Sequence, residues 1–202
     1  MSATPLCQAL PSVLAALRAQ TGQMHSGLEK RMPFFSARLD LSLYTRLIQA
    51  YYGFYQPLEA ALLGCAWLPA GLELGERLKV PTLLRDLQAL AVDQPHRLAL
   101  CTRLPAIDSP ASVLGVLYVL EGATLGGQVL RREMHARLGL DEHSGAAFLD
   151  VYGRDTGRRW KAYLSLLDEQ PTDAQFLQAA ALAAESTFAC FEQWLDCQEI
   201  LS

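Results

Sequence analysis

The sequence predicts an all-α protein, and three observations carry this prediction. Proline and glycine separate the apolar segments in the order typical of helix starts and stops. No segment shows the sustained period-two alternation of apolar and polar residues that a half-buried β-strand requires. The 202 residues, 51% of them hydrophobic and 19% charged, are enough for one folded domain and too apolar for a disordered chain. We therefore expect one domain of six to eight helices.

Six helices can be placed along the chain from these signals. Their predicted spans are 12–32, 42–65, 82–92, 110–138, 156–169 and 173–200. Pro57 predicts a kink or break in the second helix, Ser109 caps the fourth, Gly139 ends it, and Thr172 caps the last. The second helix is rich in tyrosine, which we interpret as a half-buried helix face and not as a set of cofactor contacts: Tyr44, Tyr51, Tyr52 and Tyr55.

Charge and cysteine content exclude several classes of protein. Seventeen Lys and Arg against 21 Asp and Glu leave a net charge of −4, which lacks the broad positive field that nucleic-acid binding needs. No segment reaches the ~18–20 uninterrupted apolar residues of a membrane span, so none is expected. The N-terminus has no secretory signal pattern. Five cysteines without a C-x-x-C pair argue against a disulfide framework or a cysteine-rich zinc site and favour the cytoplasm.

A histidine on the first predicted helix is a candidate metal ligand. His25 lies at the edge of the apolar stripe beside Thr21, with Arg18 two turns before it and Glu29 one turn after it. Neutral imidazole is a common ligand for iron and zinc, and a neighbouring carboxylate such as Glu29 can orient the ring. These residues by themselves leave a simpler interpretation open, in which His25 is a boundary residue satisfied by a hydrogen bond.

Four glycines interrupt the longest predicted helix, and each costs about 1 kcal/mol relative to alanine. Gly115, Gly122 and Gly126 project from nearly the same face of that helix, and the pair Gly126 and Gly127 favours a kink. Two interpretations follow. The cleared face either contacts another helix closely through small residues, or it lets a flat ligand lie against the helix backbone. A planar macrocycle suits the second interpretation.

The two segments together resemble the heme oxygenase family. The resemblance rests on LRAQTGQMHSGLEKRM around His25 and on LEGATLGGQVLRR around Gly122, in this order along the chain. It implies one all-α domain over residues 1–202 that holds heme between a proximal and a distal helix. It also implies oxidative opening of the heme ring by dioxygen and reducing equivalents, which yields biliverdin, carbon monoxide and ferrous iron.

The resemblance assigns roles to residues of this chain. His25 would be the iron ligand, with Thr21 packing one turn before it and Glu29 as its partner. Arg18 falls where the family has a basic residue that meets a heme propionate. Phe188 would pack against the heme plane. Three further residues are candidates for propionate contact: Tyr118, Arg158 and Lys161.

The distal segment departs from the animal branch of the family, which carries an aspartate directly after the first distal glycine. Gly122 and Gly126 would be the distal glycines here, but Ala123 stands in the aspartate position. The string E-G-A-T-L-G-G is closer to a bacterial branch that includes enzymes supplying biliverdin to bacterial phytochromes. Thr124 is then the candidate for ordering distal water. A ferredoxin or flavoprotein reductase is the implied electron donor, and a bacteriophytochrome is an implied recipient of the product.

Two other function classes stay open at this level. A non-catalytic heme carrier or sensor would keep His25, and the missing aspartate is compatible with it. A di-iron oxidase would use His25 and Glu29 as ligands, but such sites commonly contain Glu-x-x-His pairs, and the sequence has none.

Overall fold

The computed structural model describes residues 12–202, and within this range the chain forms seven α-helices and no β-strand. The helices are α1 (Val13–Arg31), α2 (Leu41–Gly64), α3 (Val80–Ala89), α4 (Pro110–Gly122), α5 (Gly127–Leu138), α6 (Thr156–Asp168) and α7 (Ala174–Cys197). The predicted all-α class is confirmed. Pro11, the predicted start signal of the first helix, lies outside the described residues. One domain over all 202 residues stays a prediction.

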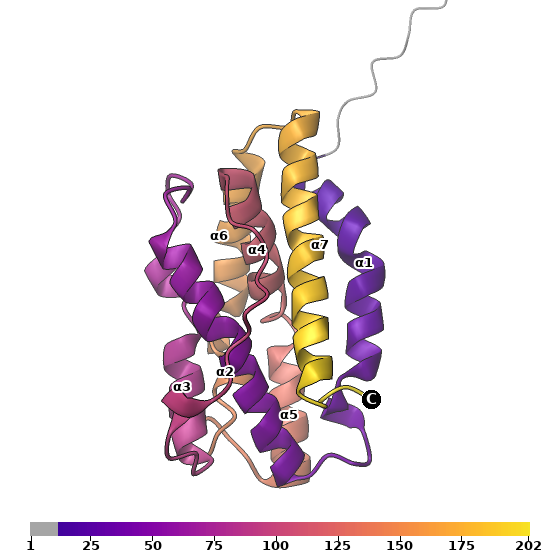
Figure 1. Cartoon of the computed structure of the whole chain (residues 1–202), viewed down its shortest axis with the longest axis vertical. Coiled ribbons are helices and arrows are strands. Elements are labelled where there is room, and N and C mark those ends of the chain that lie inside the picture. Colours follow the sequence, from indigo (N-terminus) through magenta and orange to yellow (C-terminus); the bar gives the residue numbers. More distant parts are fainter. Residues whose placement is uncertain (1–11) are drawn as a thin grey trace, which may run out of the picture.

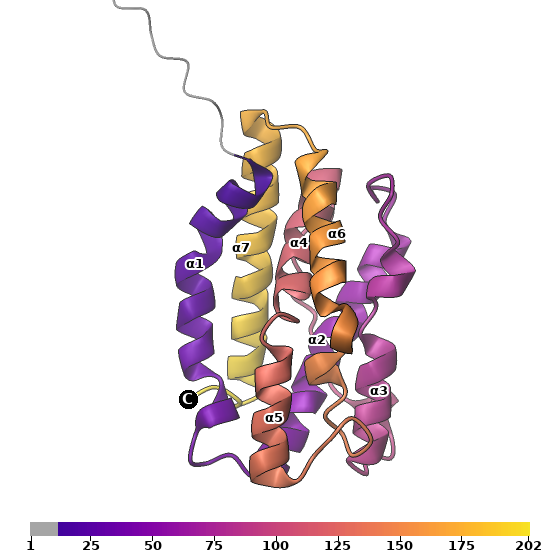
Figure 2. The same ribbon diagram turned by 180° about the vertical axis from the view of Figure 1, so that it is seen from behind.

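The long helix α7 lies in the middle of the bundle, with α4 on one side and α1 on the other (Figures 1 and 2). The contact between α4 and α7 is close because Gly115 has no side chain. A Cβ atom at Gly115 would lie 2.2 Å from the carbonyl oxygen of Ala180 and 2.8 Å from the Cβ of Ala183. For Gly115, the helix–helix interpretation of the glycines is therefore the right one.

The longest predicted helix is two helices, so the prediction of one continuous helix over 110–138 is wrong. α4 ends at Gly122, and a turn leads to α5, which begins at Gly127. Another segment lies close to the start of α5: a Cβ at Gly127 would lie 1.7 Å from the carbonyl oxygen of Leu149, so only glycine fits there. The predicted stop is confirmed, because Gly139 ends α5 in the left-handed conformation with φ of 71°.

Pro57 does not break its helix, because α2 continues through it to Gly64. A proline has no N–H, so the carbonyl four residues earlier, that of Gly53, lacks its helical partner. The backbone N–H of Cys101 donates to this carbonyl oxygen at 2.8 Å. Gly53 also lets the loop approach, since a Cβ there would lie 2.6 Å from Ala99 O. Pro57 and Gly53 thus dock the loop before α4 onto α2.

The ends of two helices differ from their predictions. Asp173, and not Thr172, caps the last helix, because its carboxylate accepts from the N–H of Phe176. This helix ends at Cys197 and not at residue 200. The third helix begins at Val80 and not at Thr82. Pro81 lies in its first turn, where a proline is tolerated because the N–H there has no helical partner anyway.

By length and composition alone, Pro110–Leu138 taken as one segment could cross a membrane. In the structure this segment is the broken pair α4 and α5, and more than half of its most apolar window is buried in the bundle. Packing against α7 and α6 accounts for the apolar character of α4.

Candidate functional site

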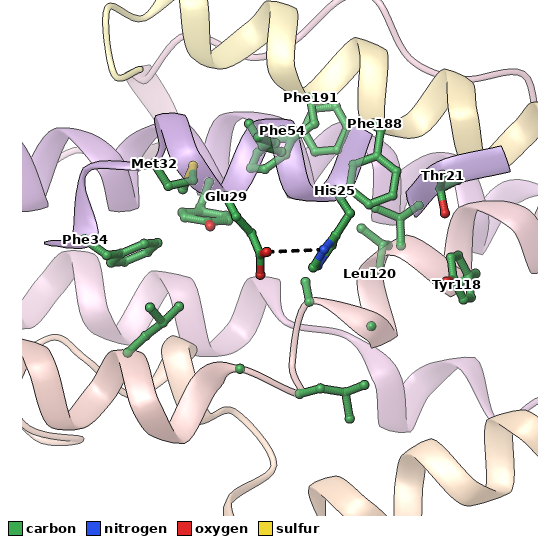
Figure 3. Close-up of a pocket in the computed structure, with 18 of the residues that line it drawn as sticks. Thr21, His25, Glu29, Met32, Phe34, Phe54, Tyr118, Leu120, Phe188 and Phe191 are labelled. Atoms are coloured by element: carbon green, nitrogen blue, oxygen red, sulfur yellow. Dashed lines mark ion pairs between the residues drawn. The ribbon is translucent and has the colours of Figure 1, made fainter. Parts of the chain in front are cut away.

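A cavity of about 820 Å³ lies between α1, α7 and the turn that joins α4 to α5 (Figure 3). Pockets of roughly 300–1,000 Å³ are typical of small-molecule sites. The walls are mainly apolar and aromatic. They come from α1 between residues 18 and 32, α2 between 51 and 55, the α4–α5 segment between 118 and 130, Trp160 of α6, and Phe188 and Phe191 of α7. The cavity therefore suits a large apolar ligand.

His25 and Glu29 stand on the cavity side of α1, one helical turn apart. The Nδ1 atom of His25 lies 3.5 Å from Oε2 of Glu29, and both side chains remain more than half exposed (Figure 3). The edge of the imidazole meets the ring of Phe188, with centroids 6.0 Å apart and planes at 88°. Since Nδ1 faces the carboxylate, Nε2 is the nitrogen left to bind a metal.

Thr21 and Arg18 complete the α1 wall. Thr21 is buried and lines the cavity, and its hydroxyl already has a partner, because it donates to the carbonyl oxygen of Leu17 at 2.8 Å. Arg18 is exposed and lines the cavity. It is the cationic side chain among the described lining residues and is placed to meet an anionic group of a ligand.

Gly122 and Gly126 form an open surface on the opposite wall. A Cβ at either position would meet no atom within 4 Å, and both residues line the cavity. Gly115 and Gly127 differ from them, because Cβ atoms there would collide with protein backbone. The four glycines thus divide into two that allow packing and two that leave room in the cavity.

Three candidate residues do not line this cavity. Arg158 is exposed and pairs with Asp155 at 3.2 Å, and Lys161 is exposed on the same helix. Trp160, between them in sequence, faces the cavity instead, because residues one or two apart on a helix point in different directions. The Thr124 hydroxyl donates to the carbonyl oxygen of Glu121 at 2.7 Å and faces a smaller cavity behind the turn.

Tyr118 does line the main cavity, where its ring lies 6.2 Å from that of Trp160. Two other tyrosines were missed: Tyr51 and Tyr55 also line the cavity, so treating the tyrosines of α2 only as a helix face is wrong for these two. Their spacing of four residues, which puts them on one side of a helix, was the available signal.

A buried group of charges behind the α4–α5 turn was also missed. The Glu121 carboxylate, 1% exposed, accepts from Arg77 Nη1 at 2.6 Å, from Lys79 Nζ, and from the Tyr152 hydroxyl at 2.9 Å. Glu59 is buried nearby and accepts from the backbone N–H of Lys79 at 2.6 Å. We call Arg77, Lys79, Glu121 and Tyr152 the distal cluster. No local pattern reveals it, because its members come from three segments that lie at least 31 residues apart in sequence.

Replacing Glu121 with glutamine is expected to lower the free energy of unfolding by about 3–5 kcal/mol, because it leaves Lys79 and Arg77 buried without their counter-charge. Urea denaturation of the ligand-free protein measures this. Glu142→Gln is the matched control, since Glu142 is half exposed in its pair with Arg131 and such pairs contribute about 0–1 kcal/mol. Equal effects of the two changes would contradict the stabilising role of the cluster.

The comparisons with known proteins agree on one family. The model of the family described as heme oxygenase matches residues 12–197. The chain belongs to the heme oxygenase family. As a heme oxygenase, it uses dioxygen and reducing equivalents to open heme to biliverdin, carbon monoxide and ferrous iron. The family thus favours the enzyme over the non-catalytic carrier or sensor.

Similar proteins span nearly the whole chain. A heme oxygenase from Xanthomonas campestris pv. campestris is 27% identical over 164 residues, which covers 78% of this chain and 91% of that protein. The structure of heme oxygenase from Leptospira interrogans is similar with a TM-score of 0.74 at 20% identity, covering 91% and 98% of the two chains. Heme oxygenase-1 from the cyanobacterium Synechocystis, in complex with heme, has a TM-score of 0.76 at 18% identity, covering 94% and 93%.

The residues of the cavity fit heme. The open surface at Gly122 and Gly126 leaves room for a flat ring, the walls are aromatic, and His25 presents a free imidazole nitrogen. Within residues 12–202, no group of three or more His, Cys, Asp or Glu side chains is placed to hold a metal ion, so the described part of this heme oxygenase contains no multi-carboxylate di-iron site.

Proposed function

We propose that this heme oxygenase binds heme in the main cavity with Nε2 of His25 as the iron ligand. The observation that supports this most is that His25, Gly122 and Gly126 line one cavity, although they lie far apart in sequence. The ring of Phe188 packs at 88° to the imidazole, and Nδ1 lies 3.5 Å from Oε2 of Glu29, which leaves Nε2 available to a ligand. The sites named in the sequence thus become one proposed heme site.

When bound, heme supplies both the iron that activates dioxygen and the ring that is opened. His25 would hold the iron through one nitrogen, which would leave a position on the iron for dioxygen. Across the cavity from His25, the backbone at Gly122 and Gly126 could approach the ring closely, because no Cβ intervenes. The surrounding apolar side chains would keep bulk water away from the bound ring.

For the heme propionates, the structure favours Arg18 over the candidates on α6. Arg18 lines the cavity, whereas Arg158 and Lys161 do not. Tyr118 lines the cavity and can donate its hydroxyl to a carboxylate. We therefore propose Arg18 and Tyr118 as the propionate contacts, while Thr124 acts within the turn behind the distal wall.

Electron supply and product use also belong to the proposal. A ferredoxin or flavoprotein reductase would deliver electrons in the cytoplasm, and a bacteriophytochrome would receive biliverdin. The bacterial relatives and the E-G-A-T-L-G-G string support this assignment. Transfer of product to a phytochrome apoprotein, followed by its red absorption band, would test the second partner.

Reconstitution with hemin tests the function directly. We expect the bound heme to lose its Soret band when oxygen and an electron donor are added, with biliverdin appearing in the product chromatogram. The same separation identifies which isomer is made. Heme that stays intact after many equivalents from a donor proven on another heme oxygenase would instead support a carrier or sensor.

Replacing Glu29 with glutamine is expected to lower the rate of biliverdin formation roughly 10–100-fold, the range typical of partners that orient a metal-binding histidine. The reason is that the neutral amide no longer holds Nδ1 of His25 by charge. Steady-state turnover measures the effect. Glu185→Gln is the control, because that partly exposed carboxylate accepts from Gln20 and does not line the cavity. A rate of biliverdin formation equal to that of the control would show that Glu29 does not orient His25.

A further inference from the structure

The distal turn, residues 122–126, carries little that could hold it in place. Gly122 and Gly126 have no side chain, and Leu125 is 49% exposed. The Thr124 hydroxyl donates to a backbone oxygen three residues before it, so it bonds locally. The height of this wall above a ligand in the main cavity therefore depends on the segments packed behind the turn.

Residues 145–152, which we call the backing segment, lie behind this turn. The segment follows α5, contacts α3 and leads to α6 (Figure 2). At the start of α5, a Cβ at Gly127 would lie 1.7 Å from the carbonyl oxygen of Leu149, so the two backbones are in direct contact. At the end of α4, the Tyr152 hydroxyl donates to Glu121 at 2.9 Å. The backing segment therefore contacts both ends of the distal turn.

A buried carboxylate holds the backing segment from the other side. Asp86 of α3 is 1% exposed, and its two oxygens accept from the backbone N–H groups of Ala147 at 3.0 Å and Phe148 at 2.7 Å. Tyr44 of α2 adds a hydrogen bond from its hydroxyl to the carbonyl oxygen of Gly145 at 2.9 Å. Asp86 is the main anchor, because it accepts two N–H groups and a charged acceptor binds them more strongly than a neutral one.

Aromatic contacts fill the space between the backing segment and α2. The ring of Phe148 lies 4.9 Å from that of Tyr51 and 5.4 Å from that of Tyr55. Close-packed side chains of this kind transmit a displacement to their neighbours, because the interior has little free volume. The backing segment thus couples the position of α2 and α3 to that of the distal turn.

We propose that Asp86 sets the position of the distal wall by holding the backing segment against the distal turn. This inference rests on the proposed binding of heme in the main cavity. Asp86 lines neither cavity, so it is a positioning residue that acts through the N–H groups of Ala147 and Phe148. A wall that recedes would hold the heme ring less tightly, and a misplacement of about 1 Å in an active site can lower a rate roughly a hundredfold.

The variant Asp86→Asn tests this anchor in the heme-free protein. Asparagine has one accepting oxygen, and its NH₂ group would face the second backbone N–H, so one of the two hydrogen bonds is lost. We expect faster hydrogen exchange of the backbone amides of Leu125 and Gly127, whose hydrogen bonds within the turn are 3.1 and 3.2 Å long. Hydrogen exchange followed by NMR resolves these amides.

Ser112→Ala is the matched control for this change. Ser112 is buried, and its Oγ accepts from the backbone N–H groups of Asp108 and Ser109, both at 3.0 Å. The substitution therefore also removes an acceptor of two backbone N–H groups, but at the end of α4 that lies far from the distal turn. The amides of the turn should exchange as they do in the wild-type protein.

A second measurement uses the ferrous heme complex with carbon monoxide, in which the C–O stretching frequency reports how closely protein groups surround the bound ligand. We expect Asp86→Asn to shift and broaden this band, to release hemin faster and to form biliverdin roughly ten- to a hundredfold more slowly. Ser112→Ala should keep the wild-type frequency and rate. A general loss of stability would not shift the band, because it does not move the distal wall of the folded protein.

A second pair of variants decides the role of the backing segment if Asp86→Asn does not fold. Tyr44→Phe removes the hydrogen bond to Gly145 and keeps the ring. Tyr163→Phe is its control, because this buried hydroxyl donates to the carbonyl oxygen of Leu114 at 2.6 Å and lines neither cavity. We expect Tyr44→Phe to change amide exchange and the C–O band in the same direction as Asp86→Asn, by a smaller amount, and Tyr163→Phe to change neither.

Two results would overturn the role of Asp86. One is amide exchange and a C–O band in Asp86→Asn equal to those of Ser112→Ala, whatever the rate of biliverdin formation. The other is a Tyr44→Phe protein that cannot be distinguished from Tyr163→Phe. If the wild-type protein binds hemin but forms no biliverdin, the proposed function fails instead, and amide exchange of the heme-free protein still shows whether Asp86 holds the distal turn.

Discussion

Replacing His25 with alanine is expected to abolish biliverdin formation and to change the visible spectrum of the heme complex. His25 is the imidazole among the described residues that line the cavity, so no neighbouring histidine can replace it as the iron ligand. The side chain is 52% exposed, and its loss should change the free energy of unfolding of the heme-free protein by no more than about 0.5 kcal/mol. The loss of activity would therefore come from ligation and not from misfolding.

The matched control for this change is His135→Ala. His135 lies exposed on α5, outside the lining of the cavity, and should leave both spectrum and turnover unchanged. Visible spectroscopy of the hemin complex and product chromatography are the measurements. A His25→Ala protein with the wild-type spectrum and wild-type turnover would disprove the assignment of the ligand.

Replacing Gly122 with leucine is expected to weaken heme binding and to stabilise the heme-free protein. A Cβ at Gly122 has no neighbour within 4 Å, so a side chain there can extend into the main cavity without displacing the backbone. Leucine in place of glycine in a helix contributes up to about 1 kcal/mol of stability. With heme bound, the same side chain overlaps the ring, and overpacking of about 1–3 kcal/mol corresponds to roughly a ten- to hundredfold weaker affinity.

Gly115→Ala is the control with the opposite sign. Its Cβ would lie 2.2 Å from Ala180 O, so it should lower the free energy of unfolding by about 1–3 kcal/mol. Hemin titration and urea denaturation of both variants make the comparison. If Gly122→Leu bound hemin as tightly as wild type, heme could not lie against the turn at this position.

The predictions of helix ends are confirmed where residues close in sequence determine the structure. The caps at Ser109 and Gly139 were placed correctly, because their hydrogen bonds form with residues three to five positions away. His25, Glu29 and Gly122 were found because their spacing on one helix, or the cost of glycine within a helix, is visible without neighbours. The family resemblance predicts that these segments form one heme site.

The predictions were wrong where contact with a segment distant in sequence determines the structure. Leu149 packs against Gly127 where the predicted helix over 110–138 is interrupted. In α2, which continues through Pro57, the N–H of Cys101 donates to the Gly53 carbonyl oxygen that proline leaves without a helical partner. The helix propensity of the residues gives no indication of either contact. Tyr51 and Tyr55 were likewise assigned to a plain helix face, because only the packing of α2 beside the distal turn shows that they line two cavities.

The helical class and the candidate status of His25, Gly122 and Gly126 could thus be derived from the chain alone, because the helical signals and the spacing on one helix depend on residues within a turn or two of one another. Which glycines face the cavity and which pack against α7 or Leu149 depends on the tertiary structure. The same holds for the distal cluster, whose stability requires residues 77, 79, 121 and 152 to exclude water together. Burial of charge is a property of the assembled bundle, and no local sequence pattern encodes it.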